Sequence, residues 1–301
     1  MSDAMGKTKN GFDLADSMIP VKEIRRGGPP RDGIPALYYP AFVPAEDAGY
    51  VKPDDRVIGV VIKGKPRAYP IKVLNWHEVV NDVIGKQNFV ITYCPLCGTG
   101  MVFGSNFNDG VREGALVFGV SGLLYNSDVL LYDRQTESLW SQIMGKAVTG
   151  KLKNSSLKQL PAFHTNLKDW LNRYPNSEVL AVDSRNQRDY ERNPYEGYEK
   201  TKRLMFKVNN KSSLDFHPKE WVLGLKVGEK TMAFPFSELR QHNKKQFEVT
   251  LDERTFTLYW NDTANSAYVR DRSGKDYAST IAFWFAWYAF HPETDVFRAS
   301  K

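Results

Sequence analysis

Cysteine is scarce in this sequence: the 301 residues include two, Cys94 and Cys97, which form a single Cys-x-x-Cys. A scaffold held by disulfides needs several cysteine pairs, so that class of protein is excluded. A bond between these two sulfur atoms would close a very small ring and add little stability. The pair is therefore better suited to metal or redox chemistry than to holding the fold together.

Long apolar runs are also missing. The most apolar stretch, residues 281–290, is too short and too aromatic for a transmembrane helix, so we expect a core element there and no membrane span. Residues 1–19 contain no apolar segment of the kind found in signal peptides. As it stands, the sequence predicts a soluble cytoplasmic protein, or an exported one if a leader has been removed.

A strong excess of one charge is absent as well. The chain carries 41 basic and 35 acidic residues, a formal net charge of +6. Nucleic-acid-binding proteins usually gather their basic residues in a stripe. The densest basic run here, 200–203 followed by Lys207 and Lys211, is typical of a solvated loop, so we expect no nucleic-acid partner. Phosphate-binding glycine motifs, His-Glu-x-x-His and the serine-hydrolase elbow are absent too.

The residues that are present favour a β-rich fold. Aromatic residues make up 13% of the chain, and segments such as 116–120 and 129–132 combine aromatic, aliphatic and β-branched side chains. A short helix is predicted over 70–81, with His77 and Val80 on its apolar face. We therefore predict an α+β protein that is predominantly antiparallel β and has short helices.

A recurring pair of sequence segments predicts two related halves. Val57-Ile-Gly-Val60 and Ala68-Tyr-Pro-Ile71 recur, with the same separation, as Val222-Leu-Gly-Leu225 and Ala233-Phe-Pro-Phe236. Trp170 and Trp287 also begin similar segments, and the second copy is shorter. The predicted organisation is an irregular lead-in at 1–35, a first half at 36–182, a polar connecting segment at 183–215 and a second half at 216–301.

Cys94-Pro-Leu-Cys97 follows a predicted strand over 88–93 and is the centre of any chemistry in this chain. Two thiolates at this spacing can bind one metal ion or each other. His77 lies on the preceding predicted helix, so its imidazole is the best third ligand. A set of Cys94, Cys97 and His77 leaves one tetrahedral position open, which suits zinc with a water molecule or copper with a weak ligand. An open position would also permit catalysis.

Five further residues could serve this site. Glu78 and Thr99 are candidates for supporting the ligands, although Glu78 also fits a solvated helix position. Tyr125, Asn126 and Asp128 are candidates for contacting a substrate, or for stabilising a turn through their own hydrogen bonds. The other histidines are not candidate ligands, since His164 and His242 are expected in loops or at the surface, and His217 and His291 in extended structure before proline.

Two other functions use the same cysteines. One is a metal-free dithiol oxidoreductase, but 101–103 is predicted as a strand, so the helix that lowers a thiol pKa in thioredoxin-like proteins is missing. The other is a non-catalytic binding module in which the thiols are structural. The expected partner is a small molecule or a metal donor.

Several longer motifs resemble those of one family, the prokaryotic domain-of-unknown-function 3179 family. They include Asn75-Trp-His77-Glu78, Tyr93-Cys-Pro-Leu-Cys-Gly-Thr99 and Phe118-Gly-Val-Ser-Gly-Leu-Leu-Tyr-Asn-Ser127. The resemblance extends over almost the whole chain, from about Asn10 to Phe297. It implies a bacterial or archaeal source and supplies no activity.

Overall fold

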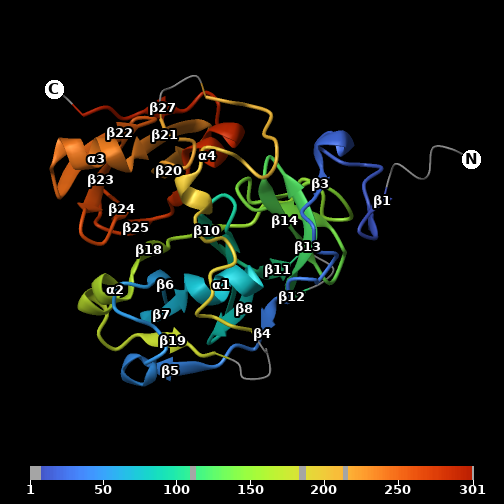
Figure 1. Ribbon diagram of the computed structural model, residues 1–301, viewed down its shortest axis with the longest axis horizontal. Helices are drawn as coiled ribbons and strands as arrows, with labels where there is room; N and C mark the ends of the chain where they lie inside the picture. Colours follow the sequence, from blue (N-terminus) through green and yellow to red (C-terminus); the bar gives the residue numbers. More distant parts are fainter. Residues whose placement is uncertain (1–7, 109–112, 183–187, 213–215, 300–301) are drawn as a thin grey trace, which may run out of the picture.

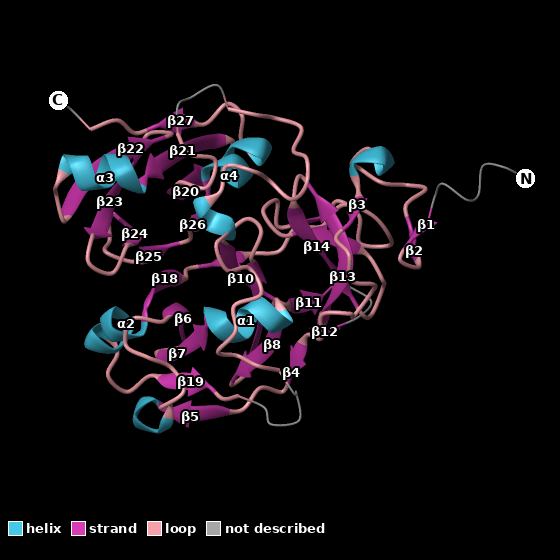
Figure 2. Ribbon diagram, viewed as in Figure 1, coloured by secondary structure: helices cyan, strands magenta, loops and turns pink. Residues whose placement is uncertain are grey.

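The computed structural model describes residues 8–108, 113–182, 188–212 and 216–299. The predicted connecting segment 183–215 therefore lies partly outside the described residues. Figure 1 shows three groups of elements: a lower lobe with α1 and α2, an upper lobe with α3 and α4, and a sheet built on β13 and β14 at the right. Strands dominate all three groups, as Figure 2 shows, which confirms the predicted β-rich fold with short helices.

The largest sheet joins strands from both predicted halves. Its order is β27-β21-β20-β26-β10-β9-β8-β4, with β17 beside β10. Within the described residues, its antiparallel pairs outnumber the parallel pairs β4–β8 and β21–β27. The strands are β4 (Leu37–Tyr38), β8 (Val79–Ile84), β9 (Gln87–Cys94), β10 (Thr99–Gly104), β17 (Gln159–Leu160), β20 (Trp221–Val227), β21 (Lys230–Pro235), β26 (Thr280–Phe283) and β27 (Asp295–Val296).

Three smaller sheets complete the lobes. The lower lobe has β18 (Phe163–Asn166), β6 (Arg56–Ile62), β7 (Lys65–Pro70), β19 (Glu178–Leu180) and β5 (Phe42–Pro44), in that order. The upper lobe has β22 (Gln246–Leu251), β23 (Arg254–Asn261), β24 (Ser266–Asp271) and β25 (Asp276–Tyr277). The sheet at the right has β16 (Lys146–Ala147), β15 (Leu139–Ser141), β14 (Asp128–Asp133), β13 (Phe118–Tyr125) and β3 (Arg25–Arg26).

Helices are short throughout the described chain. They are α1 (Ile71–His77), α2 (Leu167–Arg173), α3 (Phe236–His242) and α4 (Trp284–Phe290), with 3-10 turns η1 (Val21–Glu23), η2 (Ala45–Asp47) and η3 (Tyr198–Lys200). Two small hairpins, β1 (Thr8–Lys9) with β2 (Phe12–Asp13) and β11 (Asn106–Asn108) with β12 (Glu113–Ala115), lie outside the larger sheets. Among the described helices, none is long and apolar enough to cross a membrane.

The first helix is shorter than predicted. It ends at His77, because Glu78 adopts a left-handed backbone with φ of 58° and its N–H closes the last turn on the Leu74 carbonyl. The chain then continues as β8. Placing Val80 on the helical face was wrong, since the β-branched pair Val79 and Val80 belongs to a strand that pairs with β9.

The two predicted halves share an order of elements. Strand, strand, helix, strand, strand occurs as β6-β7-α1-β8-β9 and again as β20-β21-α3-β22-β23. In both, a tryptophan covers a glycine of the first strand: a Cβ at Gly59 would lie 2.3 Å from the Trp170 ring, and one at Gly224 would lie 2.2 Å from the Trp287 ring. Each tight contact explains why glycine is needed at that strand position.

Candidate metal centre

The two cysteines lie at the end of one hairpin. Cys94 is the last residue of β9 and pairs with Thr99, the first residue of β10. The Cys97 N–H donates to the Cys94 carbonyl across the turn (3.2 Å), and the Thr99 hydroxyl donates to the Cys97 carbonyl (3.2 Å). These bonds fix the backbone, so both thiols leave the turn toward the interior, where they are buried.

Asp128 reaches the thiols from a second hairpin. It is the first residue of β14, after a turn in which Asn126 and Ser127 both have positive φ, 50° and 68°. Two consecutive residues in this conformation are typical of the tight turns that join antiparallel strands. Asn126 helps to hold the turn, because its side-chain oxygen accepts from the Asn209 N–H (2.9 Å) and its amide donates to the Ala289 carbonyl (3.4 Å).

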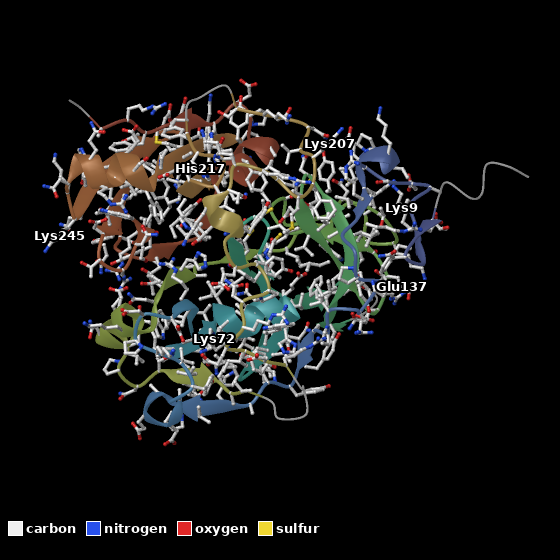
Figure 3. The ribbon with its side chains drawn as sticks, viewed as in Figure 1. Lys9, Lys72, Glu137, Lys207, His217 and Lys245 are labelled. Carbon is white, nitrogen blue, oxygen red and sulfur yellow. The ribbon has the colours of Figure 1, made fainter. Side chains whose placement is uncertain are left out.

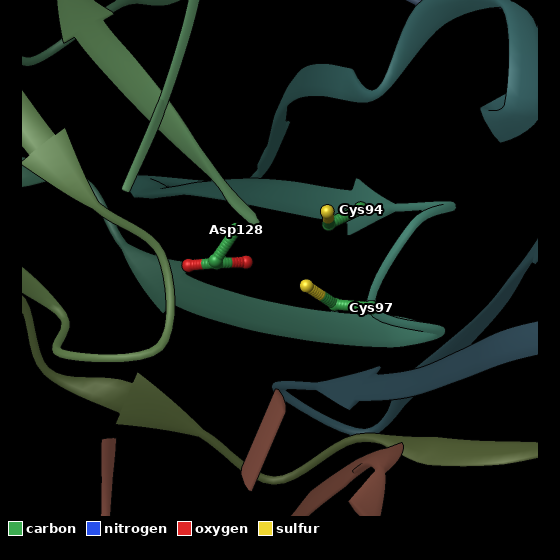
Figure 4. A group of neighbouring side chains, drawn as sticks. All are labelled: Cys94, Cys97 and Asp128. Atoms are coloured by element: carbon green, nitrogen blue, oxygen red, sulfur yellow. The ribbon is translucent and has the colours of Figure 1, made fainter. Parts of the chain in front are cut away.

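Three buried ligand atoms therefore meet in one place. The Sγ atoms of Cys94 and Cys97 and a carboxylate oxygen of Asp128 all lie within 4.8 Å of one another, and Figure 4 shows them facing a common point. The Cys97 thiol also approaches the Ser127 carbonyl (3.3 Å). Oδ2 of Asp128 accepts from the Ile143 N–H (3.0 Å), whereas Oδ1 has no N–H or O–H donor among the described residues.

Burial controls the electrostatics of this group. It raises the pKa of the Cys94 thiol, with the carboxyl groups of Asp128 and Glu78 acting in the same direction, and it raises the pKa of Cys97 well above its usual range. It also raises the pKa of Asp128 to about 7. Near neutral pH and without a cation, both thiols therefore keep their protons, and Asp128 keeps its proton in about half of the molecules.

Glu78 adds a fourth acidic group. Its side chain is buried, which corrects the alternative that it occupies a solvated helix position. Burial, followed by the charge of Asp128, raises the pKa of Glu78 to about 8. Its carbonyl accepts from the Tyr93 N–H (2.7 Å), so the backbone of Glu78 is tied to the residue before Cys94. A left-handed glutamate at such a position is uncommon and marks a site that the surrounding structure holds in place.

His77 has hydrogen bonds of its own. It is fully buried, and its Nδ1 lies 2.7 Å from the Pro35 carbonyl oxygen. A carbonyl can only accept, so Nδ1 carries a proton. Nε2 lies 2.7 Å from the Tyr190 hydroxyl. Among the described residues, the compact ligand group consists of Cys94, Cys97 and Asp128, and His77 is not a member of it.

The other predicted residues lie around this group. Thr99 is buried and bonds the cysteine turn, and Asn126 holds the turn before Asp128. The ring of Tyr125 is partly buried and packs edge-on against Phe290, with 5.6 Å between the ring centroids. Asp128 was predicted to contact a substrate or to stabilise a turn, and its carboxylate faces the thiols.

Part of the connecting segment covers this site, which was not predicted from the sequence. We call residues 195–211 the covering segment. Tyr198 and Val208 belong to the same buried core cluster as both cysteines, and Tyr195 packs against that cluster. Burial and the neighbouring Cys94 thiol raise the pKa of both tyrosines. The aromatic residues Tyr195, Tyr198 and Phe206 were the available signal, but the many charged residues around them concealed it.

One lysine fastens the covering segment. Lys219 is 4% exposed, and its ammonium donates to the carbonyls of Tyr198 (2.9 Å), Thr201 (2.6 Å) and Arg203 (2.8 Å). The same ammonium lies 3.7 Å from the centroid of the Tyr198 ring. Hydrogen bonds from a charged donor are stronger than neutral ones, so Lys219 is a firm attachment point.

A second buried histidine, His164, packs against Tyr93. His164 belongs to β18 and is 3% exposed, so the expectation of a loop or surface position was wrong. Its ring lies between those of Tyr93 and Trp221, at centroid distances of 6.2 and 5.5 Å. Burial holds its pKa well below the usual range, so the imidazole is neutral. Packing against aromatic rings explains why His164 is buried. Its strand is short and has no periodic pattern from which this burial could have been predicted.

Comparison with known proteins identifies a family. The family model described as a protein of unknown function, DUF3179, matches residues 31–281. The chain belongs to the DUF3179 family. The match confirms the resemblance seen in the motifs and includes both hairpins of the metal centre. Neither a curated protein nor a solved structure matches the chain. Family membership supplies no activity, so the function has to be inferred from the site itself.

Proposed function

We propose that this protein binds a zinc or copper ion through Cys94, Cys97 and Asp128. The observation that carries the proposal is the convergence of three buried ligand atoms within 4.8 Å. Around a tetrahedral zinc ion, thiolate and carboxylate ligand atoms lie roughly 3.5–4 Å apart, given bond lengths of about 2.3 and 2.0 Å. The group therefore needs only a small contraction to hold an ion.

The charge of the site supports a cation. Asp128 and Glu78 are buried carboxyl groups, and the influences that raise the pKa of Glu78 are burial and Asp128 alone. Burying acidic groups without a counter-charge is costly. A divalent ion would replace their protons and those of the thiols, and binding would then release protons.

Zinc is the ion that this ligand set favours. Two thiolates suit both zinc and copper, but a carboxylate is a hard ligand, and Cu(I) prefers soft ones. Three protein ligands leave a fourth tetrahedral position for water or a substrate group, which is the arrangement found in catalytic zinc sites. Tyr125 and Asn126 remain the proposed contacts for a substrate.

Two ligand sets have now been considered, and they differ in whether His77 or Asp128 is the third ligand. Metal binding by Cys94, Cys97 and His77 was predicted from the sequence, whereas the distances support Asp128 as the third ligand. We propose that His77 acts as a positioning residue, because its bonds to Pro35 and Tyr190 connect the chain before and after the site.

Metal analysis of the purified protein tests the proposal. The protein should be prepared anaerobically without a metal-affinity tag, and its metals measured by mass spectrometry beside a thiol titration. We expect about one zinc per chain, lost in Cys94→Ser and Asp128→Asn and retained in His77→Ala. If zinc is lost in His77→Ala but kept in Asp128→Asn, the ligand set predicted from the sequence, with His77 as the third ligand, would be supported instead.

A matched control comes from the same strand. Asp133 is the last residue of β14 and is fully buried, but its carboxylate accepts bonds from Thr136 and Trp140. Asp133→Asn should lower stability and keep the zinc. If neither zinc nor copper binds the wild-type protein after reconstitution, the metal proposal fails.

The metal-free dithiol alternative has less support. Both thiols have raised pKa values, whereas a reactive dithiol needs a lowered one. Cys97 also leads into β10 and not into a helix. Two thiols that cycle at a defined potential in metal-free protein would favour this function instead.

We also infer that the two halves arose by duplication and that only the first half kept or gained the site. Their shared element order and the equivalent Gly59–Trp170 and Gly224–Trp287 contacts support this. In addition, Trp170 donates to Ser177 (2.7 Å) as Trp287 does to Thr294 (3.1 Å). The β23–β24 hairpin has Asn261 and Ala264 where β9–β10 has its cysteines.

A further inference from the structure

A cavity of about 550 Å³ lies beside the covering segment and does not include the metal ligands. Its wall is largely apolar, and the aromatic part comes from Phe206, Phe216, Trp284 and Phe285. Binding sites for small molecules usually have volumes of 300–1,000 Å³ and walls of this kind. The cavity is therefore large enough for an alkyl chain or an aromatic ring system.

Three lysines also line the cavity. Lys202, Lys207 and Lys211 are exposed, and none of their ammonium groups has an ion pair or hydrogen bond among the described residues. Figure 3 labels Lys207 on the covering segment, between the upper lobe and the sheet at the right. No aspartate or glutamate is found among the described residues that line the cavity. Within the part of the chain that the structure describes, the rim therefore carries positive charge without a counter-charge.

A second basic hollow adjoins the first. It measures about 540 Å³ and shares Phe206 with the apolar cavity. Lys22, Arg25 and Arg26 line it, and none of them has an ion pair among the described residues. The nearby Glu23 carboxylate instead accepts from the Asn209 side-chain amide. The positive charge therefore continues beyond the three lysines on one face.

Trp284 provides a polar atom in the apolar wall. It is 1% exposed, and its indole N–H has no acceptor among the described residues. Buried indole N–H groups usually find a partner, and this one, which has almost no accessible surface, would need a small movement of the wall to reach an acceptor in the cavity.

We propose that this cavity binds a small amphipathic anion, namely an alkyl or aryl group that carries a carboxylate or a phosphate. The apolar part would lie against Phe216 and Trp284, and the anionic group would lie at the lysine rim. Apolar walls give affinity, and a few charged groups set the orientation and the specificity. This inference is independent of the metal, because no metal ligand lines the cavity.

Two ligands with the same chain and opposite charge test the proposal. The purified protein, with its metal content measured, is titrated with decyl phosphate and with decyltrimethylammonium below their micelle concentrations. Calorimetry and tryptophan fluorescence report the binding. We expect one decyl phosphate per chain, bound at least tenfold more tightly than the cation. Equal affinity for the two ligands, or no saturable binding of decyl phosphate, would overturn the proposal.

A matched pair of double variants locates the site. Lys207→Gln with Lys211→Gln should weaken decyl phosphate binding about fivefold for each charge removed. Lys244→Gln with Lys245→Gln should leave the affinity unchanged, since Figure 3 places Lys245 at the far end of the upper lobe. Unchanged affinity in the first pair would refute the assignment, as would sedimentation showing that the face is covered by a second copy of the chain. Zinc content should stay the same in both pairs, which separates this test from that of the metal centre.

Discussion

Asp128 and Glu78 are acidic residues whose side chains are buried. Burial raises the pKa of Asp128 from 3.8 to about 7 and that of Glu78 from 4.5 to about 8. The folded protein therefore binds these protons more tightly than the unfolded chain does. The stability that results is complete below about pH 4, decreases progressively above that pH, and is lost once the pH has risen through 7 and 8.

We expect metal-free protein to lose stability between pH 6.5 and 8.5, and Asp128→Asn to flatten this dependence. The loss should amount to a few kcal/mol, since each pKa unit is worth about 1.4 kcal/mol. Urea unfolding in the presence of a chelator measures it. His164 and His291, whose pKa values are lowered, act in the opposite direction but below pH 6.5, outside this window. A flat wild-type profile would contradict the burial of these acids.

Asp128, the proposed third ligand, was singled out from the sequence but not as a metal ligand. His77 was chosen because its predicted helix precedes the cysteine strand, and neighbours in sequence usually pack together. The helix does precede β9, but the turn at Glu78 directs His77 toward Pro35 and Tyr190. Asp128 is brought to the thiols by a tight turn with positive φ at Asn126 and Ser127, which no spacing along the chain reveals.

Most strands could be predicted from local sequence patterns, but the way in which they pack could not. Local patterns predicted β9 and β14 nearly in place, because each needs only β-branched or aromatic residues and a turn. For β13 they predicted only the first part, since the strand continues to Tyr125. The boundary between α1 and β8 was misplaced, since a helical spacing of apolar residues happened to continue into a strand. The pairing of β10 with β26, which joins the two halves, depends on contacts between distant segments.

The paired glycine–tryptophan contacts predict matching effects of substitution. Gly59→Ala and Gly224→Ala should each lower stability by about 1–3 kcal/mol, because a methyl group would collide with a fully packed indole ring. Thermal unfolding followed by circular dichroism measures both. Gly104→Ala in β10 is the control, since the nearest atom to its added Cβ would lie 3.6 Å away. A loss of stability in only one of the two variants would weaken the case for equivalent halves.

The candidate metal centre is covered by a segment whose packing the sequence did not reveal. Residues 183–215 are polar and poor in aliphatic side chains, so they were expected to form a long connecting segment between the halves. Tyr195 and Tyr198 nevertheless pack with the cysteine core, because Lys219 holds the segment from outside it. Recognition of such a cover requires knowledge of the surface beneath it.

Removal of the Lys219 ammonium should open the cover. In metal-free Lys219→Met, three carbonyls of the covering segment lose a charged donor, which should lower stability by about 1.5–3 kcal/mol. We expect the two thiols to react at least tenfold faster with a disulfide reagent under native conditions. Lys226→Met, an exposed position in β20, is the control. Unchanged thiol reactivity would mean that the segment does not limit access.

The hairpin that carries the cysteines is completed by residues from almost the other end of the chain. The Phe283 N–H donates to the Cys97 carbonyl (2.8 Å), and Gly100 pairs with Ile281. During synthesis, Cys94 and Cys97 therefore leave the ribosome long before the strand and the cover that enclose them. Such distant contacts form slowly. The thiols of a nascent chain are thus accessible to metal or oxidant for a period that the finished protein does not offer. If the proposed ion binds, it would enter most easily before the last strands close over the site.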